Sequence, residues 1–298
     1  SKMADRDMLI KQTQFTKTYY RDVYPAIDPT SPSNSQAGKV VVVTGAGKGI
    51  GREGFVKSFA KAGAKALVIV ARSPGPLEEV RQEILSINKD IIVQAVIADV
   101  RDAKSVTALW ETVKEKFGRA DVLINNAGTL NAGTVAGEDV DEWWLDFETN
   151  IRGTFLVSQG FLKLLGKERK GTILNLSSAL GLATFPGLSA YSLTKLVALK
   201  MQAFIAAENP NVVAIGMHPG LIRTDIVTGD LMPFAFDTFD LAGGTAVWLA
   251  TEKAAFLNGK YVNVNWSVEE LVQRKEEIVG QKKLDLVLSG EFGEQQFL

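Results

Sequence analysis

The chain of 298 residues contains no cysteine. This absence excludes disulfides, thiolate nucleophiles and zinc–thiolate centres, so any redox chemistry must come from a bound cofactor. Histidine is nearly absent as well, because His218 is the only one. A single histidine argues against a two-histidine metal site and a serine-hydrolase relay, and we interpret His218 as a packed or hydrogen-bonded loop residue.

Neither sign of charge is in excess, and long hydrophobic runs are missing. The 33 basic and 34 acidic side chains leave a net charge of -1, which points to neither a nucleic acid nor a charged membrane surface as partner. No run approaches the ~20 apolar residues that span a bilayer. The charged amino end, from Met3 to Ile10, lacks the apolar region of a secretory signal. We expect a cytoplasmic protein that acts on a small molecule, with no nucleic-acid and no membrane partner.

Short β-branched and apolar runs alternate with helical patterns along most of the chain. The seven strand candidates are Val40–Thr44, Ala66–Ala71, Ile91–Ala98, Val122–Asn125, Thr172–Leu176, Val212–Met217 and Lys260–Val264. Nearly continuous apolar strands are typical of a sheet that is covered on both faces. The pattern therefore predicts an α/β fold, a single Rossmann-like, doubly wound parallel sheet of about seven strands flanked by helices.

Three segments follow from composition. Residues 1–37 form a polar N-terminal arm that ends in a Pro/Ser/Asn-rich stretch, residues 38–266 form the compact domain, and residues 267–298 form a C-terminal helical tail. The tail opens with a capping box, Ser267-Val268-Glu269-Glu270. The hydrophobic content of 46% is ample for one core in the compact domain.

A glycine-rich turn, Thr44-Gly45-Ala46-Gly47-Lys48-Gly49-Ile50-Gly51, follows the first strand directly. Glycines at a strand-to-helix turn let the backbone approach a pyrophosphate, whose charge then faces the amino terminus of the helix. Alone such a loop is weak evidence. Its place in a strand–turn–helix unit at the start of the domain favours dinucleotide binding over a bare tight turn.

The second strand ends in Ala71-Arg72-Ser73, where NAD-binding proteins carry an acidic residue that binds the adenosine ribose. Without that carboxylate the 2′-phosphate of NADP is not repelled, and Arg72 can pair with it while Ser73 donates a hydrogen bond. Lys48 adds a second positive charge near this corner. We therefore predict NADP(H) as the cofactor; the alternative is that Arg72 and Lys48 are solvated surface charges.

Tyr191 and Lys195 lie four residues apart at the start of a segment with helical periodicity, so they share one helical face. A phenol with a pKa near ~10 is a poor base at neutral pH, and a nearby ammonium helps to lower this pKa. Tyr191 would then serve as a general acid/base. Upstream, a strand ends in Ser177-Ser178, and one of these two hydroxyls can hold a substrate oxygen.

Together these features resemble the short-chain dehydrogenase/reductase family, over about residues 38–265. The shared motifs are Thr44–Gly51, Asp99-Val100, Asn125-Asn126-Ala127-Gly128, Asn150, Ser178, Tyr191 with Lys195, and Pro219-Gly220. The resemblance implies one Rossmann domain that pairs into a homodimer or homotetramer through the helices around residues 143–163 and 190–207. The long amino arm and the carboxyl end depart from the family pattern.

The resemblance also implies roles for the site residues. Tyr191 would donate a proton to the developing alkoxide, Ser178 would hydrogen-bond to that oxygen, and Lys195 would bind the ribose and tune the tyrosine. Asn150 would hold a water that links Lys195 to solvent. With the residues inferred above, the expected cofactor site comprises Gly45, Gly47, Lys48, Gly49, Ile50, Gly51, Arg72, Ser73, Asp99, Val100, Asn126, Ala127, Gly128, Tyr191, Lys195, Pro219, Gly220, Ile222 and Thr224. For Asp99 and Asn126, a purely structural role in strand-end turns is equally open.

The irregular stretch between Gly220 and Ala242 lies where the family carries its substrate lid. Its large side chains are Met232, Pro233, Phe234, Phe236 and Phe239. With Trp143, Trp144 and Phe185 they suggest an apolar, ring-containing substrate, although each one taken singly is better explained by core or interface packing. The long lid and tail resemble fungal members that act in secondary metabolism.

These observations lead us to expect an NADPH-dependent carbonyl reductase without a metal. Two alternatives stay open. The enzyme could run in the opposite direction as an alcohol dehydrogenase, or the chain could be a catalytically idle NADP-binding sensor or scaffold of the same fold.

Overall fold

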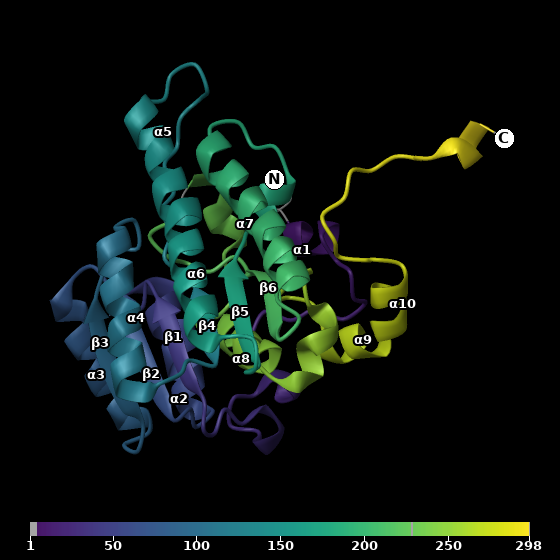
Figure 1. Ribbon diagram of the computed structural model, residues 1–298. Helices are drawn as coiled ribbons and strands as arrows, with labels where there is room; N and C mark the ends of the chain where they lie inside the picture. The colour runs from purple at the N-terminus through teal and green to yellow at the C-terminus, as the bar shows by residue number, and fades with distance from the viewer. Residues whose placement is uncertain (1–4, 228, 298) are drawn as a thin grey trace.

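The computed structural model describes residues 5–227 and 229–297. Seven strands form one parallel sheet with the order β3-β2-β1-β4-β5-β6-β7 (Figure 1). The strands are β1 (Val40–Thr44), β2 (Ala66–Ala71), β3 (Ile92–Ile97), β4 (Val122–Asn125), β5 (Gly171–Leu176), β6 (Val212–His218) and β7 (Tyr261–Asn263). The predicted doubly wound sheet is confirmed, and each strand lies where its apolar run predicted it.

Helices cover both faces of the sheet. Helices α2 (Lys57–Lys61), α3 (Pro74–Ile87) and α8 (Phe239–Leu249) lie on one face, and α4 (Ala103–Phe117), α6 (Thr154–Leu165) and α7 (Ser189–Glu208) lie on the other. The shorter elements are α1 (Met8–Gln12), α5 (Val140–Phe147), α9 (Val268–Gln273), α10 (Lys275–Gly280), the π-helical turns η3 (Gly51–Val56) and η4 (Glu148–Gly153), and the 3-10 turns η1 (Pro25–Ile27), η2 (Pro32–Asn34), η5 (Ala179–Leu182), η6 (Gly229–Phe234), η7 (Glu252–Leu257) and η8 (Glu294–Phe297).

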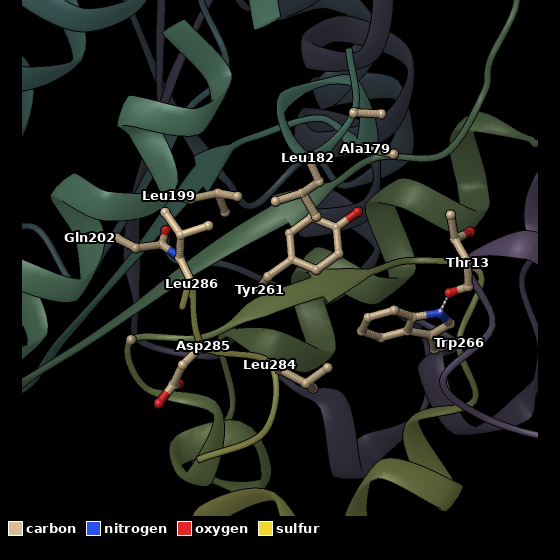
Figure 2. A pocket seen from close by; sticks show the side chains of 12 residues that line it. Thr13, Ala179, Leu182, Leu199, Gln202, Tyr261, Trp266, Leu284, Asp285 and Leu286 are labelled. Carbon is tan, nitrogen blue, oxygen red and sulfur yellow. Dashed lines mark hydrogen bonds between the residues drawn. The ribbon is translucent and has the colours of Figure 1, made fainter. Parts of the chain in front are cut away.

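The two ends of the chain meet at the β7 edge of the sheet. Tyr19 forms an antiparallel bridge with Trp266, whose indole nitrogen donates to the carbonyl of Thr13 at 2.9 Å (Figure 2). The segment expected to be a polar surface arm is therefore anchored, because Tyr24 and Ile27 are buried in the main core. An edge strand covered in this way offers few free backbone groups to another chain.

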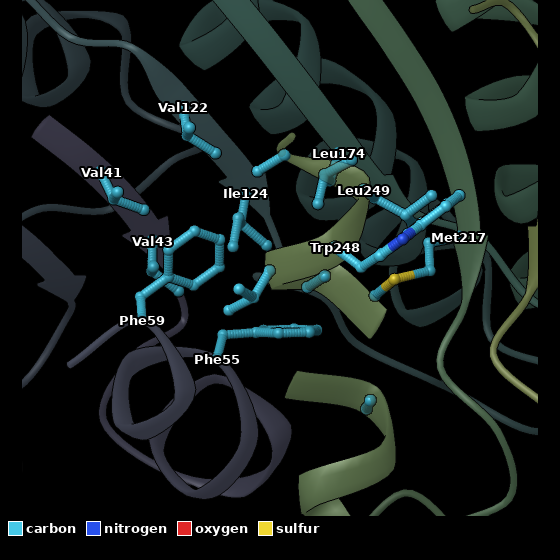
Figure 3. Close-up of a cluster of buried hydrophobic side chains, with 14 of the residues drawn as sticks. Val41, Val43, Phe55, Phe59, Val122, Ile124, Leu174, Met217, Trp248 and Leu249 are labelled. Atoms are coloured by element: carbon cyan, nitrogen blue, oxygen red, sulfur yellow. The ribbon is translucent and has the colours of Figure 1, made fainter. Parts of the chain in front are cut away.

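The core is divided by the sheet into two layers. Alternate residues of β1 point to opposite faces, so Val41 and Val43 join the layer under α2 and α8 while their neighbours face α4 and α6. Figure 3 shows the first layer, in which Phe55 and Phe59 pack against the sheet and Trp248 of α8. Since every residue of β1 is buried, its run of valines reflects burial on both faces.

The strand order reverses between β1 and β4, which are direct neighbours. Connections leaving these two strands turn to opposite faces, and a crevice opens at their carboxyl ends. In parallel sheets of this kind, ligands bind at that crevice. The glycine-rich turn after β1 and the Asn125–Gly128 stretch after β4 both lie there.

Candidate active site

The turn after β1 has the shape that a dinucleotide pyrophosphate requires. Gly45 and Gly49 adopt positive φ values of 66° and 55°. A Cβ atom on Gly51 would lie 2.3 Å from the carbonyl oxygen of Gly45, so a larger residue does not fit there. The helical run begins at Gly49, so its first N–H groups lack intrahelical partners and face the turn. The glycine loop therefore fits the predicted cofactor.

Asn126 supports this loop from the neighbouring strand end. Its side-chain amide donates to the carbonyls of Thr44 and Gly45 at 2.9 and 3.0 Å. Of the two roles considered for Asn126, the structure shows the structural one. Gly128, two residues further on, leaves room for two of the predicted catalytic residues, since a Cβ atom there would lie 3.1 Å from Asn150 Oδ1 and 3.6 Å from Lys195 Nζ.

Charged side chains gather at the carboxyl ends of β2 and β3. Arg72 and Ser73 are exposed, and among the described residues no carboxylate forms an ion pair with Arg72. Asp99 is engaged by Arg101, whose guanidinium lies 2.6 Å away and lowers the pKa of this carboxyl. The Asp99 carboxylate also accepts from Arg101 N and therefore stabilises the turn after β3. The neighbouring Val100 packs against Gly153.

Lys48 points across the crevice rather than toward Arg72. Its ammonium pairs with Asp225 at 3.0 Å, and both side chains are strongly exposed. Exposed pairs of this kind contribute little energy. The contact nevertheless places the glycine loop beside the segment that contains Thr224.

The four predicted catalytic residues come from three adjacent elements at the carboxyl edge of β5. Ser178 follows β5 and caps η5, Tyr191 and Lys195 lie in the first turns of α7, and Asn150 lies in the π-helical turn η4. The Lys195 ammonium is 5.5 Å from the centre of the Tyr191 ring and donates to the Leu176 carbonyl at 3.0 Å.

Asn150 joins the elements of this site. Its Oδ1 accepts from Thr129 N at 2.9 Å, and its Nδ2 donates to Thr129 O and to the hydroxyl of Thr194. All of these partners come from the loop after β4 and from α7. Asn150 thus holds the loop against the helix that carries the tyrosine and lysine.

The structure distinguishes between the two serines that end β5. Ser177 is buried, and its hydroxyl donates to the carbonyl of Lys195 at 3.1 Å. Ser178 instead accepts from Leu180 N, and its hydroxyl lies near enough to Tyr191 to act on the pKa of that phenol, which it lowers. Only Ser178 is therefore placed to hold a substrate oxygen beside the tyrosine.

Burial has the largest effect on the pKa values of both Tyr191 and Lys195. It raises the pKa of Tyr191 to about 12, against a smaller opposite effect of the Ser178 hydroxyl. It lowers the pKa of Lys195 to about 8. The spacing predicted a lowered tyrosine pKa, and the structure shows the opposite, because desolvation raises this pKa most and the charge of Asp146 raises it further. The lysine ammonium is directed to Leu176 O.

Asp146 is a site residue that the motifs did not reveal. It is fully buried and accepts from the Thr129 hydroxyl at 2.8 Å and from the backbone and side-chain amides of Asn131. Its negative charge raises the pKa of both Tyr191 and Lys195. An acid within the apolar Trp144-Leu145-Asp146-Phe147 stretch was the only signal, since carboxylates are seldom buried without a role.

Asp237 holds the start of the loop after β6. Gly220 has a φ of 86°, and a Cβ atom there would lie 2.7 Å from Asp237 Oδ2. This oxygen accepts from Leu221 N at 2.6 Å, while Oδ1 accepts from Arg21 and Asn265, both at 3.0 Å. The N-terminal segment therefore reaches the base of the expected lid, through a contact that spans 216 positions of sequence.

The aromatic residues expected to form the lid separate into different roles. Phe239 belongs to α8 and packs against the main core, which agrees with the packing role favoured for each of these residues taken singly. Phe236 lies among the guanidinium groups of Arg6, Arg21 and Arg223, at 4.7 to 5.8 Å. Trp143 stacks on the ring of a neighbouring phenylalanine in α5.

His218 has the structural role that its sequence context predicted. Its Nδ1 accepts from Ala179 N at 3.3 Å, and burial lowers its pKa to about 4. The imidazole is therefore neutral at physiological pH. In the part of the chain that the structure describes, no cluster of three or more acidic or histidine side chains could hold a metal ion, and no helix is long and apolar enough to cross a membrane.

Comparisons with known proteins agree with this geometry. The family model described as short chain dehydrogenase matches residues 39–231. "Short chain dehydrogenase mpl6" of Monascus purpureus is 38% identical over 287 residues, covering 93% of this chain and 96% of its own length. The 3-oxoacyl-[acyl-carrier-protein] reductase of a Synechocystis strain is 31% identical and covers 76% of this chain and 95% of its own length.

Solved structures show the same fold. The structure of levodione reductase superposes with a TM-score of 0.71 at 24% identity, covering 77% of this chain and 96% of its own. At this identity the likeness concerns the fold alone. About a quarter of this chain, then, has no counterpart in that structure.

Proposed function

Because this chain belongs to the short-chain dehydrogenase/reductase family, we propose that it is an NADP(H)-dependent oxidoreductase which reduces a carbonyl group on an apolar substrate. The observation that carries the proposal is the meeting of Tyr191, Ser178, Lys195 and Asn150 at one sheet edge beside the glycine loop.

The residues of the site divide the work of carbonyl reduction. NADPH, when bound, supplies the hydride. Ser178 donates a hydrogen bond to the carbonyl oxygen, and Tyr191 donates its proton to that oxygen as negative charge develops on it. A phenol whose pKa is raised to about 12 is protonated at neutral pH, as a proton donor must be. Lys195, with its pKa lowered to about 8, remains largely charged beside it.

The preference for NADP(H) is supported by Arg72. It follows β2 directly, is exposed, and lacks an ion-pair partner within the described residues. A guanidinium can bind a phosphate through two parallel hydrogen bonds. Lys48 contributes less to this argument than its sequence position predicted, since it pairs with Asp225.

An apolar substrate is supported by aromatic side chains near Tyr191. Trp143 stacks with Phe147 in α5 and donates to the hydroxyl of Ser189, two residues before Tyr191, and Phe185 lies exposed on the loop that leads to Tyr191. The relative from Synechocystis is named as a reductase of an oxo group on an acyl chain, which supports a carbonyl as the reacting group.

We further propose that the protein forms a homodimer through α5, α6 and α7. These helices expose four large apolar side chains, Trp144, Phe155, Leu193 and Phe204. Exposed apolar side chains in this number favour an interface with another protein over residues scattered singly on a surface. The β7 edge is less suited to pairing because the chain's own ends cover it, with Leu284 O accepting from Tyr261 N.

The test combines binding and turnover. We expect wild-type protein to bind NADPH more tightly than NADH in fluorescence titrations and to oxidise NADPH with ketones or quinones. Arg72→Glu should weaken NADPH binding about 10- to 100-fold while leaving NADH binding nearly unchanged, because one charge-assisted contact is lost. Arg81→Glu, an exposed charge reversal on α3, is the matched control and should change neither.

Tyr191→Phe decides whether the chemistry depends on the proposed proton donor. Turnover should fall by about 10² to 10⁴-fold, with the Kd for NADPH unchanged. Equal affinity for NADPH and NADH would contradict the cofactor assignment. Selective NADPH binding without turnover of any carbonyl would favour the sensor alternative.

A further inference from the structure

Two loops meet beside the predicted catalytic residues. One loop follows β4 and leads into α5, and the other spans residues 183–188 and leads to Tyr191 in α7. Gly133 of the first loop forms a parallel bridge with Leu188 of the second, and its N–H donates to Gly187 O at 2.9 Å. The position of each loop therefore depends on the other.

Glu138 packs against this bridge with its carboxyl group turned inward. A Cβ atom on Gly133 would lie 2.6, 2.8 and 3.1 Å from Cβ, Cγ and Cδ of Glu138, so the side chain of Glu138 lies on the backbone of Gly133. Both carboxyl oxygens are buried, and neither has a hydrogen-bond partner among the described residues. A carboxylate buried without donors is strongly disfavoured, whereas the neutral acid is tolerated. The packing on Gly133 therefore favours the neutral form of this carboxyl.

The charged groups around Glu138 do not compensate for its burial. The ionisable side chains that act on it are Asp146 and Glu142 of α5, and both are acidic. Apart from Glu138 and Asp139, the two loops contain no charged side chain. The free N–H groups at the start of α5 donate to the Asp139 carboxylate and not to Glu138. Burial and, to a smaller extent, the two acidic neighbours therefore raise the pKa of Glu138.

We propose that Glu138 is a positioning residue that acts as a pH-sensitive latch: in its neutral form it holds the loop after β4 against the loop that leads to Tyr191, and on ionisation it releases the two loops. The ionised carboxylate regains water only by leaving Gly133. Loss of the proton therefore favours an open state in which the hydrogen bond from Gly133 to Gly187 is broken.

The latch adjoins groups of the proposed catalytic site. The loop that it holds carries Thr129, whose N–H donates to Asn150 Oδ1, and Asn131, whose amides donate to Asp146. Opening of this loop loosens the contacts that surround Tyr191. The inference does not depend on the proposed reductase activity, because it concerns the pairing of two loops and its test needs neither substrate nor cofactor.

Hydrogen exchange of the Gly133 amide, followed by NMR on protein with isotope-labelled glycine, measures the state of the latch. The intrinsic exchange rate at each pH, divided by the observed rate, gives the protection that the hydrogen bond to Gly187 O provides. Because the closed and open states differ in the pKa of one carboxyl, protection should fall as pH rises above the ordinary pKa of 4.5 and level off above the raised one. Within this interval the fall should be up to about tenfold per pH unit.

The internal control is the amide of Gly118, which donates to Lys114 O at the end of α4. This hydrogen bond contains no contact with Glu138, so its protection should not follow the pKa of that residue. A decline shared by Gly133 and Gly118 would instead report unfolding of the whole protein.

Two substitutions separate the charge of Glu138 from its packing. Glu138→Gln keeps the shape of the side chain but cannot ionise, so protection of Gly133 should stay high and independent of pH. Glu138→Ala removes the packing on Gly133, so protection should be low at every pH. Glu111→Gln, at an exposed position of α4, is the matched control and should retain the pH dependence of wild type.

Circular dichroism at each pH establishes that every variant is folded. Wild-type protection of Gly133 that is independent of pH, or that falls in parallel with that of Gly118, would overturn the proposal. So would the same fall in Glu138→Gln, or protection in Glu138→Ala as high as in Glu138→Gln. If a variant does not fold, the comparison of Gly133 with Gly118 in wild type still decides.

Discussion

Arg21 connects the N-terminal segment to the loop after β6, and its removal tests how much that connection stabilises the protein. Arg21→Met keeps the length and the apolar stem of the side chain but removes the guanidinium. The guanidinium donates to Asp237 Oδ1 at 3.0 Å, to Asp7 at 2.7 Å and to the carbonyls of Phe234 and Arg6. Asp237 is left buried with a charge and without a cation.

The expected loss follows from burial. The Asp237 side chain is 1% exposed and that of Arg21 is 20% exposed, so the pair is largely shielded from water. Removing one partner of a buried ion pair costs about 3–5 kcal/mol. Because Asp237 keeps hydrogen bonds from Leu221 N and Asn265, we expect a loss at the lower end, about 3 kcal/mol of unfolding free energy at neutral pH.

The stability loss of Arg21→Met should depend on pH in a definite direction. Burial raises the pKa of Asp237 in the folded state, and the charge of Arg21 opposes the rise. A carboxyl with a raised folded-state pKa destabilises the fold above that pKa, and the cost disappears as pH falls below the unfolded value, near ~4. Without Arg21 the folded-state pKa rises further. The deficit of Arg21→Met should therefore be larger at pH 7 than at pH 4.5.

Urea unfolding of four proteins measures these quantities: wild type, Arg21→Met, Asp237→Asn and the double variant. The double variant should lose at least about 1 kcal/mol less unfolding free energy than the sum of the two single losses, because a neutral amide in place of the carboxylate leaves no buried charge without a cation. Arg6→Met, which removes a cation from Phe236 but no ion pair with Asp237, is the control and should cost under about 1 kcal/mol. Additive losses, or a deficit independent of pH, would refute the assignment.

Three further predictions concern other parts of the molecule. Asp146→Asn should move the pH profile of kcat/KM to lower pH, because the aspartate charge raises the pKa of both Tyr191 and Lys195, the proposed catalytic pair; an unchanged profile would show that this charge is screened. Gly220→Ala should destabilise the protein by about 1–3 kcal/mol more than Gly118→Ala in thermal unfolding, since both glycines have positive φ but only Gly220 is crowded by a neighbouring side chain. Equal losses would mean that the loop at Gly220 shifts to accommodate the methyl group. Phe204→Lys should dissociate the proposed dimer without unfolding it, as light scattering after gel filtration would detect; a wild-type monomer would contradict the dimer outright.

Local patterns carried much of this protein's architecture. The seven strands lie within one or two residues of their apolar runs, because burial on both faces makes a parallel strand nearly continuous in hydrophobicity. The glycine-rich turn could also be predicted from the sequence, since positive φ at Gly45 and Gly49 is a local requirement of the backbone. The spacing of Tyr191 and Lys195 likewise depends only on the helical repeat.

Contacts between segments distant in the sequence could not be predicted in this way. Nothing near Arg21 indicates that it meets Asp237, since the pairing depends on how the N-terminal segment crosses the β7 edge. The choice between Ser177 and Ser178 required the position of α7 relative to β5. The shift in the pKa of Tyr191 was predicted in the wrong direction, because the spacing of Tyr191 and Lys195 along the helix says nothing of the burial that raises this pKa. Periodicity and turn chemistry act between neighbours along the chain, whereas burial, ion pairing and pKa depend on what surrounds a group in three dimensions.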